Sequence, residues 1–440
     1  MAAVQTAIEI HDVDVLIIGG GPAGSTAATL LAERGHRVVL LEKAHHPRFH
    51  IGESLLPANL PLFERLGVAE EIRAIGMQKW GAEFVSPWHG RAETFEFKNA
   101  ANAQLPYAYQ VRRSQFDEIL IRRAGRAGAQ VVEGCCVRAA DISAGAQFVR
   151  VEAVHDDERR ESWHARFLVD ASGRDTFLAS QLGAKRRNRK HNSAAIYAHF
   201  AGAQQYAGRR AGNISIYWFE HGWLWFIPLA DGTASVGAVV WPAYLKQRRV
   251  PLAEFFLATI AKCAPLAARL RHAQLVSAVE ATGNYSYSAS HSHGERYLMI
   301  GDAYAFIDPV FSSGVWLAMN SAAVAADAID ACLHHSAHAH RTLRKFDRVM
   351  RHGPRVFSWF IYRITNPTLR ELFMQPGDQF GMKRAVLSVL GGDIFGNTPI
   401  WKSLRMFKAL YLLLSVFNPR RTLNALRQRV IDVRPGVPDE

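Results

Sequence analysis

Cysteine is scarce in this sequence, and its four cysteines have no spacing typical of a metal site. Cys135 and Cys136 are adjacent, which is poor geometry for a disulfide between them, while Cys263 and Cys332 are isolated in the chain. The sequence therefore predicts reduced thiols and no metal centre.

Long hydrophobic runs are also lacking. The longest strongly apolar stretch, ALYLLLSVF at 409–417, is too short to span a bilayer. The N-terminal MAAVQTAIEIHDVDV has no basic start followed by an apolar run, as a secretory signal would. We therefore expect a soluble cytoplasmic protein, and 440 residues with 49% apolar content are enough for a sizeable core.

Acidic residues are in deficit, because 39 Asp and Glu stand against 52 Lys and Arg, a formal charge of +13. A positive field raises the encounter rate with anions, which favours an acidic partner, substrate or surface. No motif that reads nucleic acid accompanies the charge, so nucleic acid is not expected as a partner.

A glycine-rich turn near the N-terminus carries the first positive signal. Residues 13–43, VDVLIIGGGPAGSTAATLLAERGHRVVLLEK, predict a strand, a glycine turn, a helix and a second strand. Gly19, Gly21 and Gly24 satisfy G-x-G-x-x-G, which permits a tight turn, close approach of a pyrophosphate and close helix packing. Glu42, 18 residues after Gly24, can accept hydrogen bonds from ribose hydroxyls. Together these features predict a dinucleotide site.

A second unusual stretch is GWLWFIPL at 222–229. In an extended chain Trp223, Trp225 and Ile227 share one face, and Leu224, Phe226 and Pro228 share the other. The flanking ISIYWF and ASVGAVV also predict strands, separated from it by turn residues. Two neighbouring indoles favour the wall of a site, although a plain buried strand is the alternative.

Three distal segments make the chain resemble the FAD-dependent monooxygenase superfamily. These are FLVDASGRDT with Asp170, YLMIGDAYAF with Asp302, and VRRSQFDEIL with Arg113. The Ala-Ser-Gly after Asp170 departs from the commoner Asp-Gly. Only one dinucleotide fingerprint is visible, so we expect a separate NAD(P)H-dependent flavin reductase to supply FADH2.

Within this superfamily the chain resembles the flavin-dependent halogenases over about residues 10–330. The motifs that carry the resemblance are W-x-W-x-I-P at 223–228, F-x-x-P-x-x-S-x-G at 306–314, the Gly-Glu-Ser loop in FHIGESLLP (49–57), and Lys79 in K-x-G-A-x-F. The resemblance implies that Lys79, Trp223 and Trp225 are catalytic and that Ser313 and Gly314 bind halide. It implies FAD contacts from Gly19, Gly21, Ala23, Gly24, Glu42, Lys43, Glu53, Ser54, Arg113, Asp170, Asp302, Pro309, Gly314 and Val315.

The chemistry implied by this family uses reduced FAD, O2 and chloride or bromide. A peroxyflavin oxidises the halide to hypohalous acid, which passes to the lysine and then to an aromatic substrate of secondary metabolism. Lys79 can act as an ammonium that donates a hydrogen bond or, when deprotonated by burial, as a haloamine, and the sequence does not choose between these. Glu53 and Ser54 can alternatively do no more than shape a turn.

The residue at position 311 is informative about the substrate class. In the branch that halogenates free tryptophan, a glutamate precedes the serine of the F-x-x-P motif, and here Phe311 takes that place. The departure favours an activated phenol or pyrrole, free or bound to an acyl or peptidyl carrier protein.

The C-terminal segment from 331 is predicted to be a basic helical lobe. Residues 340–364 and 401–430 mix aromatic or aliphatic stripes with Lys and Arg at helical spacing. Such a lobe can cap the substrate cavity, dock an acidic carrier protein or contact a membrane peripherally, and packing helices with solvated charges are the plain alternative. His334, His335, His338 and His340 are interpreted as a solvated loop without acidic or cysteine partners.

The predicted fold is α/β. A discontinuous Rossmann-like FAD domain (1–75, 105–185 and 290–330) carries an inserted β-sheet substrate region (76–104 and 186–289) and a helical lobe (331–440). The rival functions are an FAD-dependent aromatic hydroxylase, a geranylgeranyl-reductase-like oxidoreductase, and a flavin-binding protein without turnover.

Overall fold

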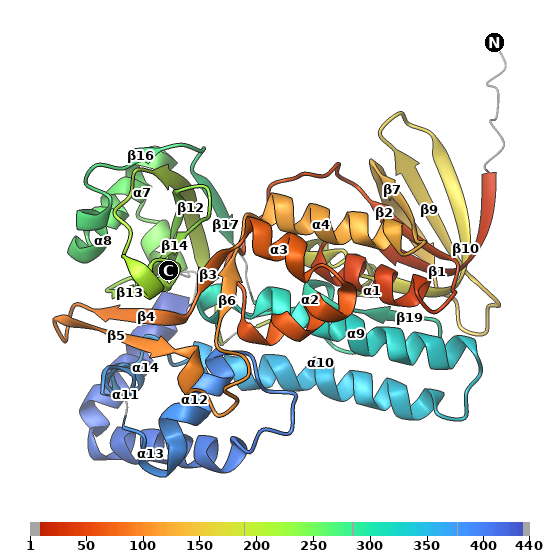
Figure 1. The fold of residues 1–440 in the computed structure, drawn as a ribbon. Coiled ribbons are helices and arrows are strands. Elements are labelled where there is room, and N and C mark those ends of the chain that lie inside the picture. Colours follow the sequence, from red (N-terminus) through yellow and green to blue (C-terminus); the bar gives the residue numbers. More distant parts are fainter. Residues whose placement is uncertain (1–8, 189, 284–285, 376, 434–440) are drawn as a thin grey trace, which may run out of the picture.

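A mostly parallel sheet forms one half of the computed structural model, which describes residues 9–188, 190–283, 286–375 and 377–433 (Figure 1). In spatial order its strands are β7 (Gln130–Glu133), β2 (Val38–Glu42), β1 (Glu9–Ile18), β10 (Arg160–Asp170), β9 (Val149–His155) and β8 (Cys135–Asp141), with β19 (Tyr297–Met299) also beside β10. The parallel pairs β2–β1 and β1–β10 bring the carboxyl ends of these strands to one edge. Ligands bind beyond this edge in such sheets.

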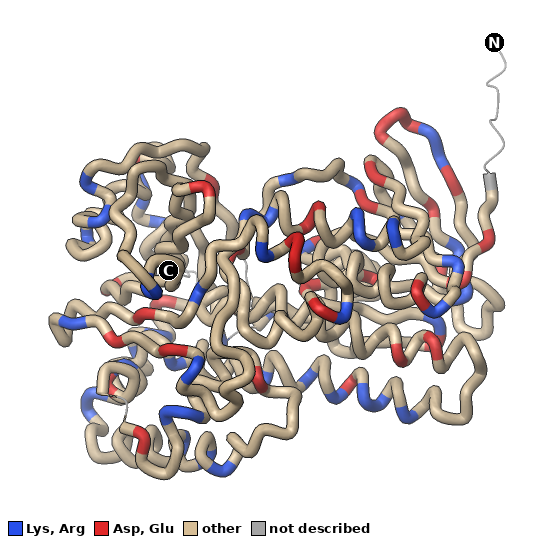
Figure 2. Tube along the Cα trace, in the orientation of Figure 1, with Lys and Arg blue, Asp and Glu red and all other residues tan. Residues whose placement is uncertain are grey.

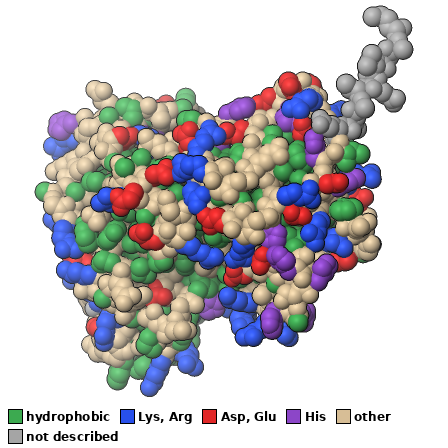
Figure 3. Space-filling view, turned by 45° about the vertical axis from the view of Figure 1, so that its right-hand side comes forward, with side chains coloured by type: hydrophobic (Ala, Val, Ile, Leu, Met, Phe, Trp, Pro, Cys, Tyr) green, Lys and Arg blue, Asp and Glu red, His purple; other side chains and the backbone are tan. Residues whose placement is uncertain are grey.

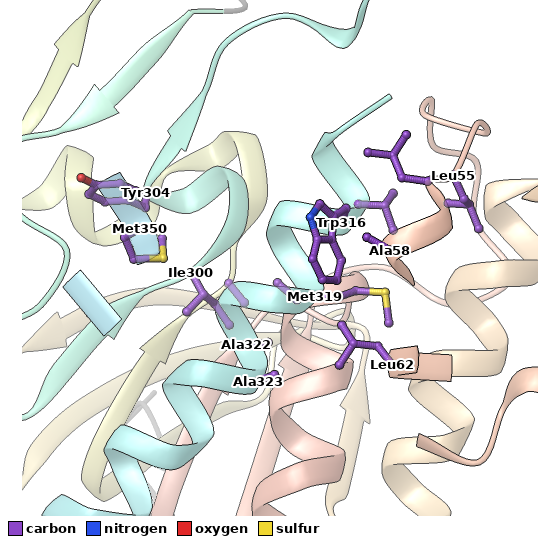
Figure 4. Packing of buried hydrophobic residues seen from close by; sticks show 14 of the residues in the cluster. Leu55, Ala58, Leu62, Ile300, Tyr304, Trp316, Met319, Ala322, Ala323 and Met350 are labelled. Carbon is purple, nitrogen blue, oxygen red and sulfur yellow. The ribbon is translucent and has the colours of Figure 1, made fainter. Parts of the chain in front are cut away.

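Beside this sheet, helix α1 (Pro22–Ala32) packs against both α4 (Arg113–Arg126) and α9 (Gly314–Leu333). Helix α9 is rich in alanine where it approaches α1, and small side chains allow close packing. Near the start of α9, Trp316 and Met319 lie close to Leu55 and to Leu62 of α2 (Leu60–Leu66) (Figure 4). Helix α3 (Ala69–Ile75) follows α2.

A second, mixed sheet of eight strands forms the other half (Figure 1). Its order is β16 (Gln274–Leu275), β12 (Ala194–Ala201), β15 (Thr233–Val240), β14 (Gly222–Pro228), β13 (Ile214–Phe219), β4 (Gly81–Ser86) and β5 (Arg91–Glu96), with β17 (Glu280–Gly283) also on β12. Three smaller helices belong to this half: α6 (Pro242–Leu245), α7 (Leu252–Ala261) and α8 (Ala264–Arg269).

The two predicted faces of GWLWFIPL are confirmed in β14, which is a central strand of this sheet. Trp223, Trp225 and Ile227 belong to the main core, whereas Leu224 and Phe226 belong to a second core completed by α7 and α8. The side-chain period of two separates the faces in this way.

Small elements complete the body. Two short sheets pair β3 (Met77–Lys79) with β6 (Ala108–Gln110), and β11 (Lys185–Arg187) with β18 (Tyr287–Ala289) and β20 (Ala305–Phe306). The short helices are α5 (Phe177–Gln181), η1 (Pro57–Asn59), η2 (Phe97–Asn99), η3 (Gly173–Asp175), η4 (Gly208–Arg210), η5 (Gly301–Ala303), η6 (Pro309–Phe311) and η7 (Gln379–Gly381).

The C-terminal residues are helical, as predicted: α10 (Ala339–Ile361), α11 (Pro367–Met374), α12 (Met382–Leu390), α13 (Trp401–Phe417) and α14 (Pro419–Val433). Lys and Arg recur along α10 and among the last helices (Figure 2). Within the described ranges, every helix is too short or too polar to cross a membrane. The α/β class is confirmed, while the domain boundaries stay a prediction because one hydrophobic core joins residues of both sheets and this lobe.

Candidate cofactor cavity and buried lysine

A cavity of about 490 Å³ lies where the ends of β1 and β2 meet the indole face of β14. All residues expected to contact the cofactor line it except Gly24 and Asp170: Gly19, Gly21, Ala23, Glu42, Lys43, Glu53, Ser54, Arg113, Asp302, Pro309, Gly314 and Val315. Segments from distant parts of the sequence therefore meet at one site.

The glycine turn has the geometry that its motif predicts. Gly19 has φ +99°, in the region that favours glycine, and a Cβ on Gly24 would lie 1.9 Å from the Gly19 carbonyl oxygen. Gly21 is the N-cap of α1 and lines the cavity together with Pro22 and Ala23, so the start of this helix borders the cavity. The Gly20 N–H donates to Glu42 Oε2 at 2.6 Å, which ties the turn to the end of β2. This cradle fits a pyrophosphate.

Asp170 lies outside the cavity lining, next to residues that do line it. Its Oδ1 accepts from the Ser172 N–H at 2.9 Å and its Oδ2 from the Leu178 N–H at 2.7 Å. Burial raises the pKa of this carboxyl. Asp170 thus shapes the segment whose Ala171 to Asp175 line the cavity, rather than facing it.

Arg113 and Asp302 are far apart in the sequence but line the same cavity. Arg113 forms a two-pronged ion pair with Asp117, at 2.7 and 2.9 Å, and donates to the Ile51 carbonyl at 3.0 Å. Burial raises the pKa of Asp302 to about 6. This half-buried carboxylate lines the cavity, where the ribityl hydroxyls of FAD would donate hydrogen bonds to it.

Glu53 provides an independent test of fit. Its Oε1 lies 2.9 Å from His199 Nε2, whereas its buried Oε2 has no hydrogen-bond partner among the described residues. Because Glu53 lines the cavity, a polar group of a bound ligand would satisfy that oxygen. The residues present therefore fit a flavin dinucleotide.

Several cavity residues were missed by the sequence reasoning. Arg48 lies beside the glycine turn, where a Cβ on Gly21 would be 3.6 Å from its Nη2, and its buried Nε has no hydrogen-bond partner among the described residues. Phe49 stacks on Tyr197 with ring centroids 6.1 Å apart. Arg48 belongs to no recognisable motif, and Phe49 opens the FHIGESLLP segment but lies outside its Gly-Glu-Ser motif, so no local signal identified either residue.

The two indoles form part of the cavity wall. Trp223 and Trp225 are each 4% exposed, and their ring centroids are 5.9 Å apart. Trp225 Nε1 donates to Ser235 Oγ at 3.2 Å, which meets the need of a buried indole N–H. Across the sheet, a Cβ on Gly237 would lie 2.2 Å from Trp225 Cζ2, so this glycine makes room for the ring.

Lys79 lies just behind the cavity, with 1% of its side chain surface exposed. Its Nζ donates to Ser54 Oγ at 2.9 Å and to the Leu55 carbonyl at 3.0 Å, and it sits 5.4 Å from the centroid of Phe97. Burial lowers the pKa of Lys79 to about 7. The Gly-Glu-Ser loop therefore contacts the cavity through Glu53 and the lysine through Ser54.

The segment that leads into α9 contains Ser313 and Gly314, the residues expected to bind halide. Ser312 has φ +55° and Ser313 is the N-cap of α9, which begins at Gly314. Gly314 lines the main cavity, whereas Ser313 lines a small cavity beside it. Phe311 points away into the core, against Phe357 and Phe360 of α10.

The interpretation of the histidine segment needs one correction. His334 was expected to lack an acidic partner, but its Nδ1 lies 3.4 Å from Asp330 Oδ1, one turn earlier in α9. His36 Nε2 also lies 2.8 Å from the same oxygen. Sequence spacing alone could not reveal His36, which is almost 300 residues away.

Comparison with known proteins identifies the family. The FAD binding domain family matches residues 12–346. A tryptophan 2-halogenase of Chondromyces crocatus is 35% identical to this chain. The match covers 72% of this chain and 60% of that protein's length. A 1H-pyrrole-2-carbonyl-[peptidyl-carrier protein] chlorinase of Pseudomonas fluorescens is 29% identical over 88% of this chain and 90% of its own.

Among solved structures, the myxobacterial chondrochloren halogenase is 35% identical and superimposes with a TM-score of 0.76, covering 80% of this chain and 82% of that one. The shared fold, the cavity and these sequence matches agree. The chain belongs to the flavin-dependent halogenases, a group within the FAD-binding monooxygenase family.

Proposed function

We propose that the protein uses FADH2, O2 and chloride or bromide to make hypohalous acid and delivers it to Lys79 for halogenation of an activated phenol or pyrrole. The observation that carries the proposal is the buried Lys79 ammonium site, joined through Ser54 and Glu53 to the cofactor cavity. When bound in its reduced form, FAD supplies with O2 the oxidising equivalent for the halide.

The halide site is assigned to the backbone N–H groups of Ser313 and Gly314. The start of a 20-residue helix carries partial positive charge, and its first N–H groups lack partners within the helix. Both residues line cavity surface, so an anion can reach them. Arg48, beside the glycine turn, is the cation assigned to the pyrophosphate.

Trp223 and Trp225 are assigned to the passage of hypohalous acid. Their rings exclude water from the wall of the cavity, and Trp225 Nε1 is already occupied by Ser235. A largely apolar wall of this kind gives hypohalous acid little opportunity to react before it reaches Lys79.

For Lys79 we propose the ammonium form. Two of its three N–H groups donate to Ser54 and Leu55, which leaves one to donate to the oxygen of hypohalous acid. The ring carbon then takes the halogen, the displaced ring proton combines with the departing hydroxide, and water is released. A halogenation rate that rises rather than falls as the pH passes 7 would instead assign the haloamine form.

The substrate class is inferred from Phe311. Its side chain is packed against α10, so this position offers no carboxylate to assist proton loss from a poorly activated ring. A phenol or pyrrole needs less assistance. Because one relative acts on a carrier-bound pyrrole and another on tryptophan, the substrate panel must contain free tryptophan, free phenols and pyrroles, and carrier-bound pyrrole.

Two partners are proposed, a carrier protein and a flavin reductase. The alignment with the carrier-dependent chlorinase extends over 88% of this chain, which supports a carrier-bound substrate. A single dinucleotide fingerprint, at Gly19 to Gly24, supports a separate NAD(P)H-dependent flavin reductase. NADPH added without a reductase should therefore leave bound FAD oxidised.

The direct test is Lys79→Met with FAD, NADH, a flavin reductase, O2 and bromide, followed by mass spectrometry of the substrate panel. We expect at least a hundredfold loss of brominated product, while FAD binding and reductase-dependent oxygen consumption persist. Lys185→Ala is the matched control, because Lys185 Nζ also donates to a hydroxyl, that of Thr176, but lies outside the cavity lining. Bromination by Lys79→Met at the wild-type rate would refute the assignment.

A further inference from the structure

A buried carboxylate lies at the base of the loop that leads into α9. Asp308 is 4% exposed, and its Oδ1 accepts from the Val310 N–H at 3.1 Å, which caps the short helix η6. Helix η6 is followed directly by Ser312 in the left-handed region and by Ser313 at the N-cap of α9. The position of Asp308 therefore sets the direction in which this turn enters the helix.

The other oxygen of Asp308 is held by a separate segment. His191 Nε2 lies 2.7 Å from Asp308 Oδ2, and Ser193 Oγ donates to the same atom at 3.0 Å. All three side chains are buried. His191 Nδ1 has no hydrogen-bond partner in the described part of the chain, so Nε2 carries the proton that Asp308 accepts.

The segment that holds Asp308 is itself fixed from its far side. Arg429 of α14 donates to the Lys190 carbonyl at 2.9 Å, and Asn192 Nδ2 donates to the Val433 carbonyl at 3.4 Å. The His191 ring packs edge-on against Trp241, with centroids 5.8 Å apart. His191 therefore has little freedom to follow Asp308 if the loop moves.

We propose that His191 is a positioning residue for halide binding: through Asp308 it fixes the turn that aims the Ser313 and Gly314 N–H groups at the anion. The inference rests on the halide site of the proposed function. Asp308 and Ser313 line the same small cavity, so an unpaired Asp308 carboxylate would also oppose an anion there. Removal of the histidine donor should weaken halide binding through both geometry and charge.

The test compares His191→Phe, His191→Gln and Ser193→Ala in the full-length FAD-loaded protein. Phenylalanine keeps an aromatic ring but removes the donor, whereas glutamine retains an N–H donor. His36→Phe is the control, because it breaks a partly buried histidine–aspartate pair at the opposite end of α9, where His36 Nε2 meets Asp330 at 2.8 Å. Bromide is titrated twice, by the change in flavin absorbance and by the rate of bromination.

We expect His191→Phe to raise the half-saturating bromide concentration at least tenfold in both titrations, with kcat at saturating bromide within threefold of wild type. His191→Gln should recover most of the affinity, Ser193→Ala should show a smaller loss, and His36→Phe should change it less than twofold. Unchanged bromide affinity in His191→Phe, or equal losses in His36→Phe, would overturn the inference. If wild type binds bromide but brominates nothing, the proposed function fails while the absorbance titration still decides the role of His191.

Discussion

Lys79 combines a catalytic assignment with an unfavourable environment. Its amine is removed from water, its two hydrogen-bond acceptors are neutral, and burial lowers the pKa of Lys79 to about 7. A neutral hydroxyl and carbonyl do not replace the hydration of an ammonium. The folded state therefore carries a cost at any pH at which this group is charged.

We expect Lys79→Met to be more stable than wild type at pH 7, despite losing halogenation. Between pH 7 and the ordinary lysine pKa, the unfolded chain binds a proton that the folded chain does not, so wild-type stability rises with pH across this window. The free energy of unfolding of Lys79→Met should exceed that of wild type by a few kcal/mol, as an order of magnitude, at pH 7. This difference should shrink towards pH 10. Thermal unfolding of both proteins at pH 7, 8.5 and 10 measures it, and a difference that does not vary with pH would contradict the assigned burial.

At the level of elements, β14 and β15 act together on the indoles. Gly237 of β15 lies opposite Trp225 in the register, and a side chain there would enter the space of the indole. Because the other face of β14 fills the second core, the strand cannot shift outwards to make room. The position of Trp225 is thus determined from both sides.

Gly237→Ala should displace Trp225 and lower the fraction of consumed O2 that yields halogenated product. The inserted methyl group should also reduce the free energy of unfolding by about 1–3 kcal/mol, as overpacking does. Gly125→Ala is the control, since a Cβ there comes no closer than 3.9 Å to its nearest neighbour, Val131. Equal coupling of O2 to product in both variants would show that the indole position does not matter.

The sequence predicted elements well wherever local periodicity and turn residues agreed. The glycine turn, the strands flanking GWLWFIPL and the two faces of that segment are all confirmed. Local pattern could not tell that the Asp170 carboxylate faces backbone N–H groups instead of the cavity. Nor could it pair His191 with Asp308, since 117 residues separate them and neither stands in a pattern that requires the other.

For the molecule as a whole, charge and apolar surface coincide on the last two helices. Leu412, Leu413, Val416, Phe417, Leu423, Leu426, Val430 and Ile431 of α13 and α14 are each 49–74% exposed. The same helices carry seven Lys or Arg and one acidic residue, Asp432, between 401 and 433. On the face drawn in Figure 3, by contrast, acidic and basic side chains are interspersed. An exposed apolar surface flanked by positive charge suits an acidic protein partner, and we propose the carrier protein.

Reversing Arg420 and Arg427 to Glu should raise the KM for pyrrole-2-carbonyl carrier protein severalfold at low salt and flatten its salt dependence. Turnover of a free pyrrole should not change. Arg421 is left intact because it forms an ion pair with Glu371 at 2.6 Å. The matched control reverses the exposed Arg344 and Arg348 of α10.

Kinetics of both double variants between 25 and 300 mM NaCl, together with flotation on phosphatidylglycerol vesicles, separate the alternatives. Equal increases in KM in the two double variants would show that net charge, and not this surface, determines carrier binding. Loss of vesicle binding without any change in carrier kinetics would assign this surface to a membrane.

The loop from Glu53 to Leu55 connects the cofactor cavity with Lys79. Glu53 and Ser54 border the cofactor cavity, and Ser54 and the adjacent Leu55 supply both acceptors of Lys79. Departure of the cofactor cannot shift this loop without also changing how far water reaches the amine. Cofactor affinity and lysine ionisation are then linked quantities, so the affinity for FAD should vary with pH around 7, where Lys79 titrates.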